Sequence, residues 1–195
     1  MKETIFRWCR DHRVHHKYIE TNADPHNIKR GFFFAHIGWL MCKKHPAVYA
    51  AGRKLPMDDL LADPVVRFNT KYFYPMFLFF CFIFPTVIPV YFWSENWLDA
   101  FCVAGVLRYV FQLHCIFTTN SLAHMFGYRP FDKNIDARDS LFYDSIFPGE
   151  GDHNFHHTFP RDYKAKEHGF SLNTGRFFIE LMALFGQAYD LKVFC

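Results

Sequence analysis

A chain of 195 residues predicts one domain, or one and a fraction. Hydrophobic residues make up 51% of it and Phe occurs 26 times, which favours a packed or lipid-facing chain over disorder. The net charge of +3, without a clustered basic stripe, argues against a nucleic-acid partner. Six cysteines without a C-x-x-C pair predict reduced, mostly buried thiols and exclude a disulfide framework.

The first segment, residues 1–71, reads as cytosolic helices and loops and opens with a cluster of imidazoles. His12, His15 and His16 follow the pattern H-x-x-H-H, which places all three on one face of an α-helix. With 12 His in 195 residues, this pattern should arise by chance ~0.04 times per chain. The stretches "KKHP" and "KLPMDDLLADP" predict turns that precede further helices.

The second segment, residues 72–125, predicts a transmembrane helical hairpin. Residues 72–93 carry no charge and are long enough to span about 30 Å of hydrocarbon. The short link "SEN" leads to a second apolar stretch, in which Arg108 is expected to face protein or a polar cavity. The alternative is a buried helical hairpin in a soluble protein.

Basic residues flank the outer ends of this hairpin, among them Arg67, Lys71 and Arg129, whereas the tight link carries acidic ones. The positive-inside rule therefore predicts that both outer ends lie in the cytosol. Asn120 and His124 lie four residues apart at one of these ends, which predicts that they share a helical face.

The third segment, residues 126–195, combines loops ("FGYRPFDKN", "FPGEGD") with a predicted amphipathic helix over residues 172–191. It also repeats H-x-x-H-H at His153, His156 and His157. Two independent occurrences have a chance probability of roughly one in a thousand. The chain is thus predicted to be an all-α integral membrane protein, with one transmembrane hairpin and a cytosolic helical cap that carries the histidines.

The histidine clusters indicate a metal centre, because crowded imidazoles favour the neutral, metal-binding form. Imidazole suits Zn, Cu, Fe and Ni, so ligand type alone does not choose among them. Seven histidines exceed the four ligands of one zinc ion and favour two metals. A membrane location suggests an oily substrate, and attack on an unactivated hydrocarbon requires an oxidant such as iron with dioxygen. The residues by themselves thus lead to a membrane di-iron oxidase acting on lipid.

At this point the sequence resembles the membrane acyl-CoA desaturases of animals, of the stearoyl-CoA delta-9 type. The runs that match are "RDHRVHHKYIETNADPHNIKRGFFFAHIGWLMCKKHP", "MDDLLADPVV", "NSLAHMFGYRPFDKNI" and "GDHNFHHTFPRDY". The resemblance implies that a cis double bond is inserted into a saturated acyl chain on coenzyme A. It further implies two irons, O2, electrons from cytochrome b5 and its reductase, and an endoplasmic reticulum membrane with the irons facing the cytosol.

The resemblance also assigns roles to residues. The positions of iron ligands in the family, one of them binding through water at Asn120, fall on His12, His15, His16, Asn120, His124, His153, His156 and His157. The positions that hold the coenzyme A head fall on Arg10, Asp11, Lys43 and Lys44, and Trp8 aligns with an aromatic residue near the acyl entrance. From the residues alone, Lys43 and Lys44 are interpreted equally well as a pair of solvent-exposed basic side chains. Trp8 alone would be interpreted as a side chain that packs between helices.

Departures from the family pattern keep other functions open. The family has three histidine boxes and four spans, whereas this chain begins just before the second box and lacks the first box with its two ligands. It is therefore expected to be either a fragment or a short product. Asp152 also stands where an aromatic residue is usual and is expected to alter the charge beside His153. The alternatives are a catalytically inactive relative that acts by binding, and a lipid hydroxylase.

Overall fold

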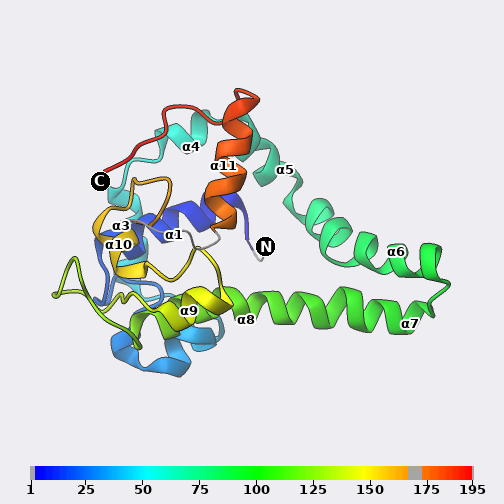
Figure 1. The fold of residues 1–195 in the computed structure, drawn as a ribbon, viewed down its shortest axis with the longest axis horizontal. Coiled ribbons are helices and arrows are strands. Elements are labelled where there is room, and N and C mark those ends of the chain that lie inside the picture. The colour runs from blue at the N-terminus through cyan, green and yellow to red at the C-terminus, as the bar shows by residue number, and fades with distance from the viewer. Residues whose placement is uncertain (1–2, 167–172, 195) are drawn as a thin grey trace.

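The computed structural model describes residues 3–166 and 173–194. These residues form helices and loops, and among them no strand occurs beyond two isolated bridges, Tyr128 with Asp139 and Asp139 with Asp152. A long hairpin projects from a cluster of shorter helices (Figure 1). The predicted all-α class is therefore confirmed.

The N-terminal part is a set of short helices that pack on the first one. Its elements are α1 (Ile5–Lys17), the 3-10 turn η1 (Ile28–Arg30), the π-helical η2 (Phe34–Gly38), α2 (Trp39–Met41), α3 (Pro46–Lys54) and α4 (Asp58–Ala62). Val14 of α1 forms a small apolar core with Val48 and Ala51 of α3. Arg13 and Asp59 join α1 to α4 through paired hydrogen bonds of 2.9 and 2.5 Å. The turn predicted over 43–46 precedes α3, whereas the stretch over 54–64, predicted as a turn before a helix, itself contains α4 and leads into the next helix at Pro64.

The hairpin consists of two long helical runs. Its elements are α5 (Pro64–Leu78), π-helical η3 (Phe79–Ile83), α6 (Phe84–Trp93), α7 (Trp97–Ala100), π-helical η4 (Phe101–Leu107), α8 (Arg108–Ser121) and the 3-10 turn η5 (Leu122–His124). By length and composition both runs can cross a membrane, with mean hydropathies of 2.0 and 1.6. Only 11% and 17% of their most apolar windows are buried, which disfavours the core hairpin of a soluble protein.

The first run begins earlier than the sequence suggested. It starts at Pro64 because the Asp63 carboxylate accepts hydrogen bonds from the N–H groups of Val65 and Val66 at 2.7 and 3.1 Å. The predicted start, Tyr72, is a kink with φ −107° and ψ 19° inside the longer helix. Pro75 lies three residues further on, and its ring disfavours a regular preceding turn.

Arg108 is exposed, and its guanidinium donates to backbone carbonyl groups of both runs of the hairpin. Its Nη2 donates to the carbonyl of Cys81 at 2.6 Å, and its Nε donates to that of Ala104 at 2.7 Å. The guanidinium therefore contacts protein, as predicted for a charge in an apolar helix.

The C-terminal part contributes three helices. They are α9 (Leu141–Ile146), α10 (His153–Thr158) and α11 (Thr174–Leu184). The predicted 172–191 helix is too long: it ends at Leu184, since Gly186 adopts φ +67° and its N–H closes back on the carbonyl of Ala183. The predicted first residue, Leu172, lies outside the described residues.

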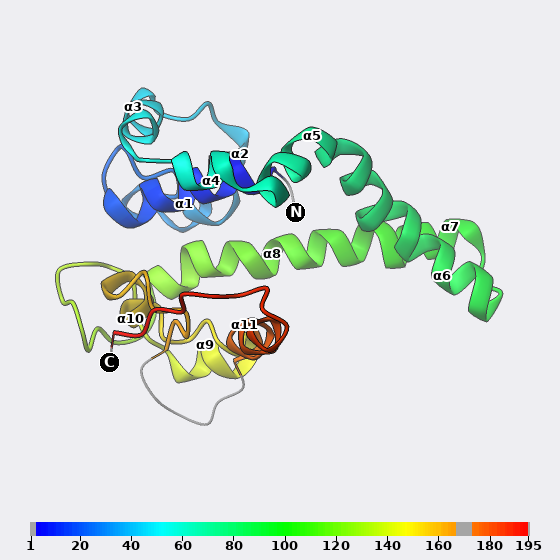
Figure 2. The ribbon, with the colours of Figure 1, turned by 90° about the horizontal axis from the view of Figure 1, so that it is seen from above.

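The three parts meet around α8. Figure 2 shows α8 running between the N-terminal helices on one side and α9, α10 and α11 on the other. The end of α8 and the turn η5 therefore face both histidine-bearing helices. The prediction of mostly buried thiols is wrong for the described cysteines, because Cys42 and Cys102 are exposed and Cys9, Cys81 and Cys115 are partly exposed. All five are free thiols, and Cys195 lies outside the described residues.

Candidate metal centre

Helix α1 positions three of the predicted ligands. It begins after Thr4, whose Oγ1 accepts a hydrogen bond from the N–H of Arg7 at 3.2 Å, and it continues to Lys17. His12 and His16 lie one turn apart, and His15 lies beside them, as the i, i+3, i+4 spacing predicted.

Helix α10 is only six residues long and is capped from outside. Asp152 precedes it but makes no side-chain cap. Instead, the Asp139 carboxylate accepts hydrogen bonds from the N–H groups of Asn154 and Phe155 at 2.7 and 3.3 Å. This carboxylate stabilises the first turn of a helix too short to form alone.

Asn154 fixes the loop around α10. Its side chain is fully buried, and Oδ1 accepts from the N–H groups of Phe131 and Asp132 at 2.9 and 3.0 Å. Its Nδ2 donates to the carbonyls of Asp132 and Ala137, both at 2.9 Å. The amide is thus fully satisfied, and the residue between two predicted ligands positions the loop over 131–137.

His124 reaches the centre from the end of the hairpin. Helix α8 stops at Ser121, so His124 belongs to the 3-10 turn η5 that continues the helical run, and the predicted shared face with Asn120 stays a prediction. Asn120 lines a cavity beside the histidines, and its role as a ligand through water stays a prediction.

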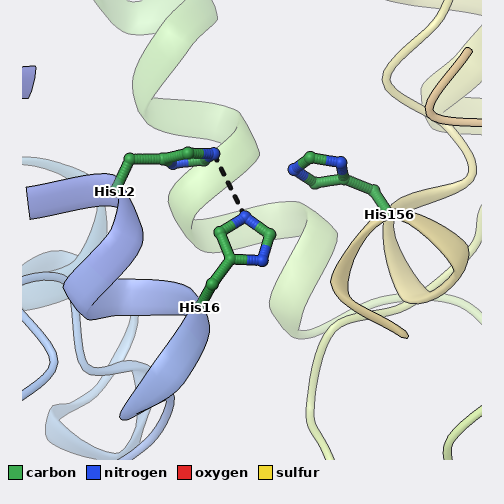
Figure 3. A group of neighbouring side chains, drawn as sticks. All are labelled: His12, His16 and His156. Atoms are coloured by element: carbon green, nitrogen blue, oxygen red, sulfur yellow. Dashed lines mark hydrogen bonds between the residues drawn. The ribbon is translucent and has the colours of Figure 1, made fainter. Parts of the chain in front are cut away.

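The histidines divide into two groups. The first histidine group is His12, His16 and His156, and the second histidine group is His15, His124 and His157. In each group the candidate ligand nitrogens lie within 4.8 Å of one another. Each sequence triplet is thus split between the groups, and each group takes residues from both α1 and α10. Figure 3 shows the first group, with two rings from α1 facing the ring from α10.

His153 and the ring-to-ring contacts tie the second group together. The Nε2 atom of His153 lies 3.0 Å from that of His124 and 3.2 Å from that of His157. In the first group, Nε2 of His12 and of His16 are 3.1 Å apart. Ring nitrogens so close together can share a hydrogen bond, in which one ring donates, or can bind one cation together through their lone pairs.

Burial keeps these rings neutral. Burial, reinforced by the nearby rings of His15 and His156, lowers the pKa of His12 to about 3. Burial and His15 lower the pKa of His156 to about 4. The pKa values of His16, His153 and His157 are also lowered, in each case mainly by burial. The lone pairs required of metal ligands are therefore present near neutral pH, so the chemistry of this donor set fits a metal.

The two groups differ in what orients their rings. His15 Nδ1 lies 2.8 Å from Oδ1 of Asp24, and both side chains are buried. By contrast, the buried Nδ1 atoms of His16 and His156 have no hydrogen-bond partner among the residues described. Carboxylates that hold the second nitrogen of a ligand histidine are common at metal sites.

An apolar cavity of about 630 Å³ opens beside the histidines. His12, His153 and His156 lie in its wall, and apolar residues form much of the remainder, including Trp8, Trp39, Leu113, Ile116 and Phe117. Trp8 also stacks on His12, with ring centroids 4.7 Å apart and planes inclined by 14°. The cavity can hold an extended apolar chain next to the candidate metal sites.

A second cavity of about 470 Å³ is basic. Its wall includes Arg30, Lys43, Lys44 and His45, and it shares Trp39 with the apolar cavity. Two of the predicted head-group residues, Lys43 and Lys44, thus lie together on one wall. The positive charges suit a phosphate-bearing group.

Arg10 and Asp11 have a different local role. Asp11 is buried, and Arg10 donates to its Oδ1 at 2.8 Å while Lys44 pairs with its Oδ2. This arrangement joins α1 to the loop before α3. Contact of Arg10 with a substrate stays a prediction, since its guanidinium points to Asp11.

Several residues near the centre were not predicted. Asp24, Asp139 and Asn154 orient ligands or their helices, and His26 lies with its ring centroid 5.6 Å from that of His15. The "NADPHN" run contains two of these residues, but their contacts depend on the tertiary fold. Asp152 was predicted to add negative charge beside His153, and this charge is partly offset because Lys166 Nζ lies 3.5 Å from the Asp152 carboxylate.

Two clusters of buried and partly buried imidazoles at the end of an apolar hairpin define a helical, membrane-type protein with a candidate histidine metal centre. The sequence profile described as fatty acid desaturase matches residues 3–164. The chain belongs to the fatty acid desaturase family.

Curated relatives agree with this family. The chain is 50% identical over 192 residues to Delta(9)-fatty-acid desaturase fat-7 of Caenorhabditis elegans, covering 98% of this chain and 57% of that protein. It is 50% identical over 188 residues to human stearoyl-CoA desaturase, covering 96% of this chain and 52% of the human protein. It is 51% identical over 188 residues to stearoyl-CoA desaturase 5 of Bos taurus, covering 96% of this chain and 56% of the bovine protein. The chain thus spans about half the length of the curated relatives it matches.

Proposed function

We propose that these residues belong to an acyl-CoA desaturase that inserts a cis double bond, at the delta-9 position, into a saturated fatty acyl-CoA. The observation that carries the proposal is an apolar cavity whose wall contains His12 and His156 of the first histidine group and His153, which contacts the second histidine group. The names of the relatives, which are delta-9 and stearoyl-CoA desaturases, support the same reaction.

The two cavities supply complementary surfaces for such a substrate. An acyl chain fits the apolar walls near Trp8 and Phe117, whereas a phosphate-rich head group fits the basic wall with Lys43 and Lys44. Trp39 lies between the two surfaces. A thioester that bridges them would present its chain to the histidine groups.

The histidines and Asn120 would hold two irons. Bound iron would pass electrons from an external donor to O2 and would supply the oxidising power that an unactivated C–H bond requires. The overall balance removes two hydrogen atoms from adjacent carbons and combines them with O2, two electrons and two protons to give two waters. The chain's own contribution is to hold neutral rings in fixed positions and to keep water from the reacting carbons with apolar walls.

Electrons would come from cytochrome b5 and its reductase, and the protein would lie in the endoplasmic reticulum membrane with the histidines in the cytosol. The basic residues at the outer ends of the hairpin, such as Arg67 and Arg129, support this orientation. Both ends lie on the histidine-bearing side of the structure (Figure 1).

Product analysis tests the proposal. A full-length protein carrying these residues is expressed in microsomes with stearoyl-CoA, NADH, cytochrome b5 and its reductase. Oleoyl product is expected, and its formation should disappear when His157 is changed to Ala. Absence of any product would contradict the proposal, and an alcohol in place of the alkene would indicate a hydroxylase.

A further inference from the structure

Asp24 is a buried carboxylate outside both histidine triplets. Its side chain is 1% exposed and lies 2.8 Å from Nδ1 of His15, a member of the second histidine group. The same carboxylate accepts hydrogen bonds from the backbone N–H groups of Glu20 and His26, both at 2.9 Å. These bonds fix the position of the carboxylate independently of any metal.

The contact dictates the state of the His15 ring. A carboxylate accepts but does not donate, so Nδ1 carries the hydrogen and Nε2 is the nitrogen that can bind a metal. The ring also cannot rotate without losing a buried, charge-assisted hydrogen bond. His15 is therefore held as an Nε2 ligand before metal arrives.

We propose that Asp24 is a positioning residue that fixes the tautomer and the orientation of His15 for metal binding by the second histidine group. The inference rests on the proposed function, since it assumes that the histidines bind metal. Asp24 also lines the basic cavity, so the same side chain separates the candidate head-group site from the metal site.

The test is a Co²⁺ titration of the metal-free, full-length protein, followed by visible absorption. Asp24→Asn keeps the size of the side chain and removes its charge. Asp162→Asn is the matched control, because Asp162 is also buried and accepts two backbone N–H groups, those of Lys164 and Phe194, both at 2.9 Å. His15→Ala and the double variant complete a mutant cycle.

Asp24→Asn is expected to weaken Co²⁺ binding about 10- to 100-fold and to change the absorption band, whereas Asp162→Asn leaves both unchanged. In the His15→Ala background, Asp24→Asn should have no further effect. Unchanged Co²⁺ binding in Asp24→Asn would overturn the inference. It would also be overturned if the double variant lost affinity by the product of the losses in Asp24→Asn and His15→Ala, because the two residues would then act independently. If Asp24→Asn does not fold, Asp24→Ser is measured instead, because it also removes the carboxylate, and wild-type affinity in that variant would also overturn the inference.

The outcomes separate this inference from the proposed function. Absence of Co²⁺ binding by the wild-type protein would contradict the metal centre, and both proposals would fail. Tight binding by the wild-type protein together with equal binding by Asp24→Asn would contradict the role of Asp24 alone.

Discussion

The first and second histidine groups contain the same kind of ligand but are held differently. The first group takes its rings from two helices, and the buried Nδ1 atoms of His16 and His156 have no hydrogen-bond partner among the residues described. The second group takes its rings from α1, η5 and α10, and Asp24 holds His15 in place. Equal ligand sets can therefore differ in how far the protein orients them before a metal binds.

The largest expected effect distinguishes the groups directly. His15→Ala removes an oriented, buried ligand and should weaken the tighter of the two metal sites by more than about 100-fold, since even an outer partner costs up to that much. His12→Ala should mainly affect the weaker site. Co²⁺ titration of both variants measures the two affinities, and equal losses at the same site would contradict the division into groups.

A change at Asp139 should affect both groups together. This carboxylate caps α10, which carries His156 of the first group and His157 of the second. Asp139→Ala should lower the free energy of unfolding by about 2–3 kcal/mol, because charged hydrogen bonds to a buried helix end are lost. Both Co²⁺ affinities should fall.

Asp190→Asn is the surface control for that experiment, because Asp190 pairs with exposed Lys192 and Asn tolerates its φ of +55° as Asp does. Its unfolding and metal binding should match those of the wild-type protein. Loss of metal at one site only in Asp139→Ala would show that α10 does not serve both groups.

The pH dependence of the metal-free protein follows from the first group. An unfolded imidazole titrates near 6.5, whereas burial holds the pKa of His12 at about 3 and that of His156 at about 4. As the pH falls below 6.5, the unfolded state binds more protons than the folded state, so the free energy of unfolding decreases until about pH 3–4.

Between pH 7 and pH 5, each of these two imidazoles should cost about 1–2 kcal/mol of stability. Thermal unfolding in detergent at both pH values measures the loss, and replacing His12 and His156 together with Ala should reduce it. A melting temperature that stays constant between pH 7 and pH 5 would show that these rings are not buried neutral.

Trp8 should give the smallest effect. It is 48% exposed and stacks on His12, so Trp8→Ala should weaken metal binding by the first group by about 0.5–1.5 kcal/mol and leave the second unchanged. Trp8→Phe keeps an aromatic ring and should restore most of the affinity. Equal effects on both groups would mean that Trp8 acts through the general fold.

Local patterns predicted much of this structure. The i, i+3, i+4 spacing placed His12, His15 and His16 on α1, and the uncharged run over 72–93 indicated the hairpin. Its true start at Pro64 was missed, because the predicted run was bounded by the charge of Lys71, whereas the Asp63 cap sets where the helix begins. Thiol burial was wrong because residues such as Cys102 lie on an outward face of the hairpin.

The division of the histidines could not be predicted from spacing. Which ring joins which group depends on how α1 and α10 approach each other, and these helices lie more than 130 residues apart. The orienting contacts are also non-local: Asn154 binds the loop near Phe131, and Asp139 caps a helix that begins at His153. Such contacts exist only after the tertiary fold has formed.

The central claim is that the two histidine groups hold two metals of a desaturase centre. The most direct test is the iron content of the purified full-length protein, measured per chain beside His15→Ala and His12→Ala. Two irons per chain in the wild-type protein and fewer in each variant are predicted. One iron or none in the wild-type protein would contradict the claim and would favour a non-catalytic relative.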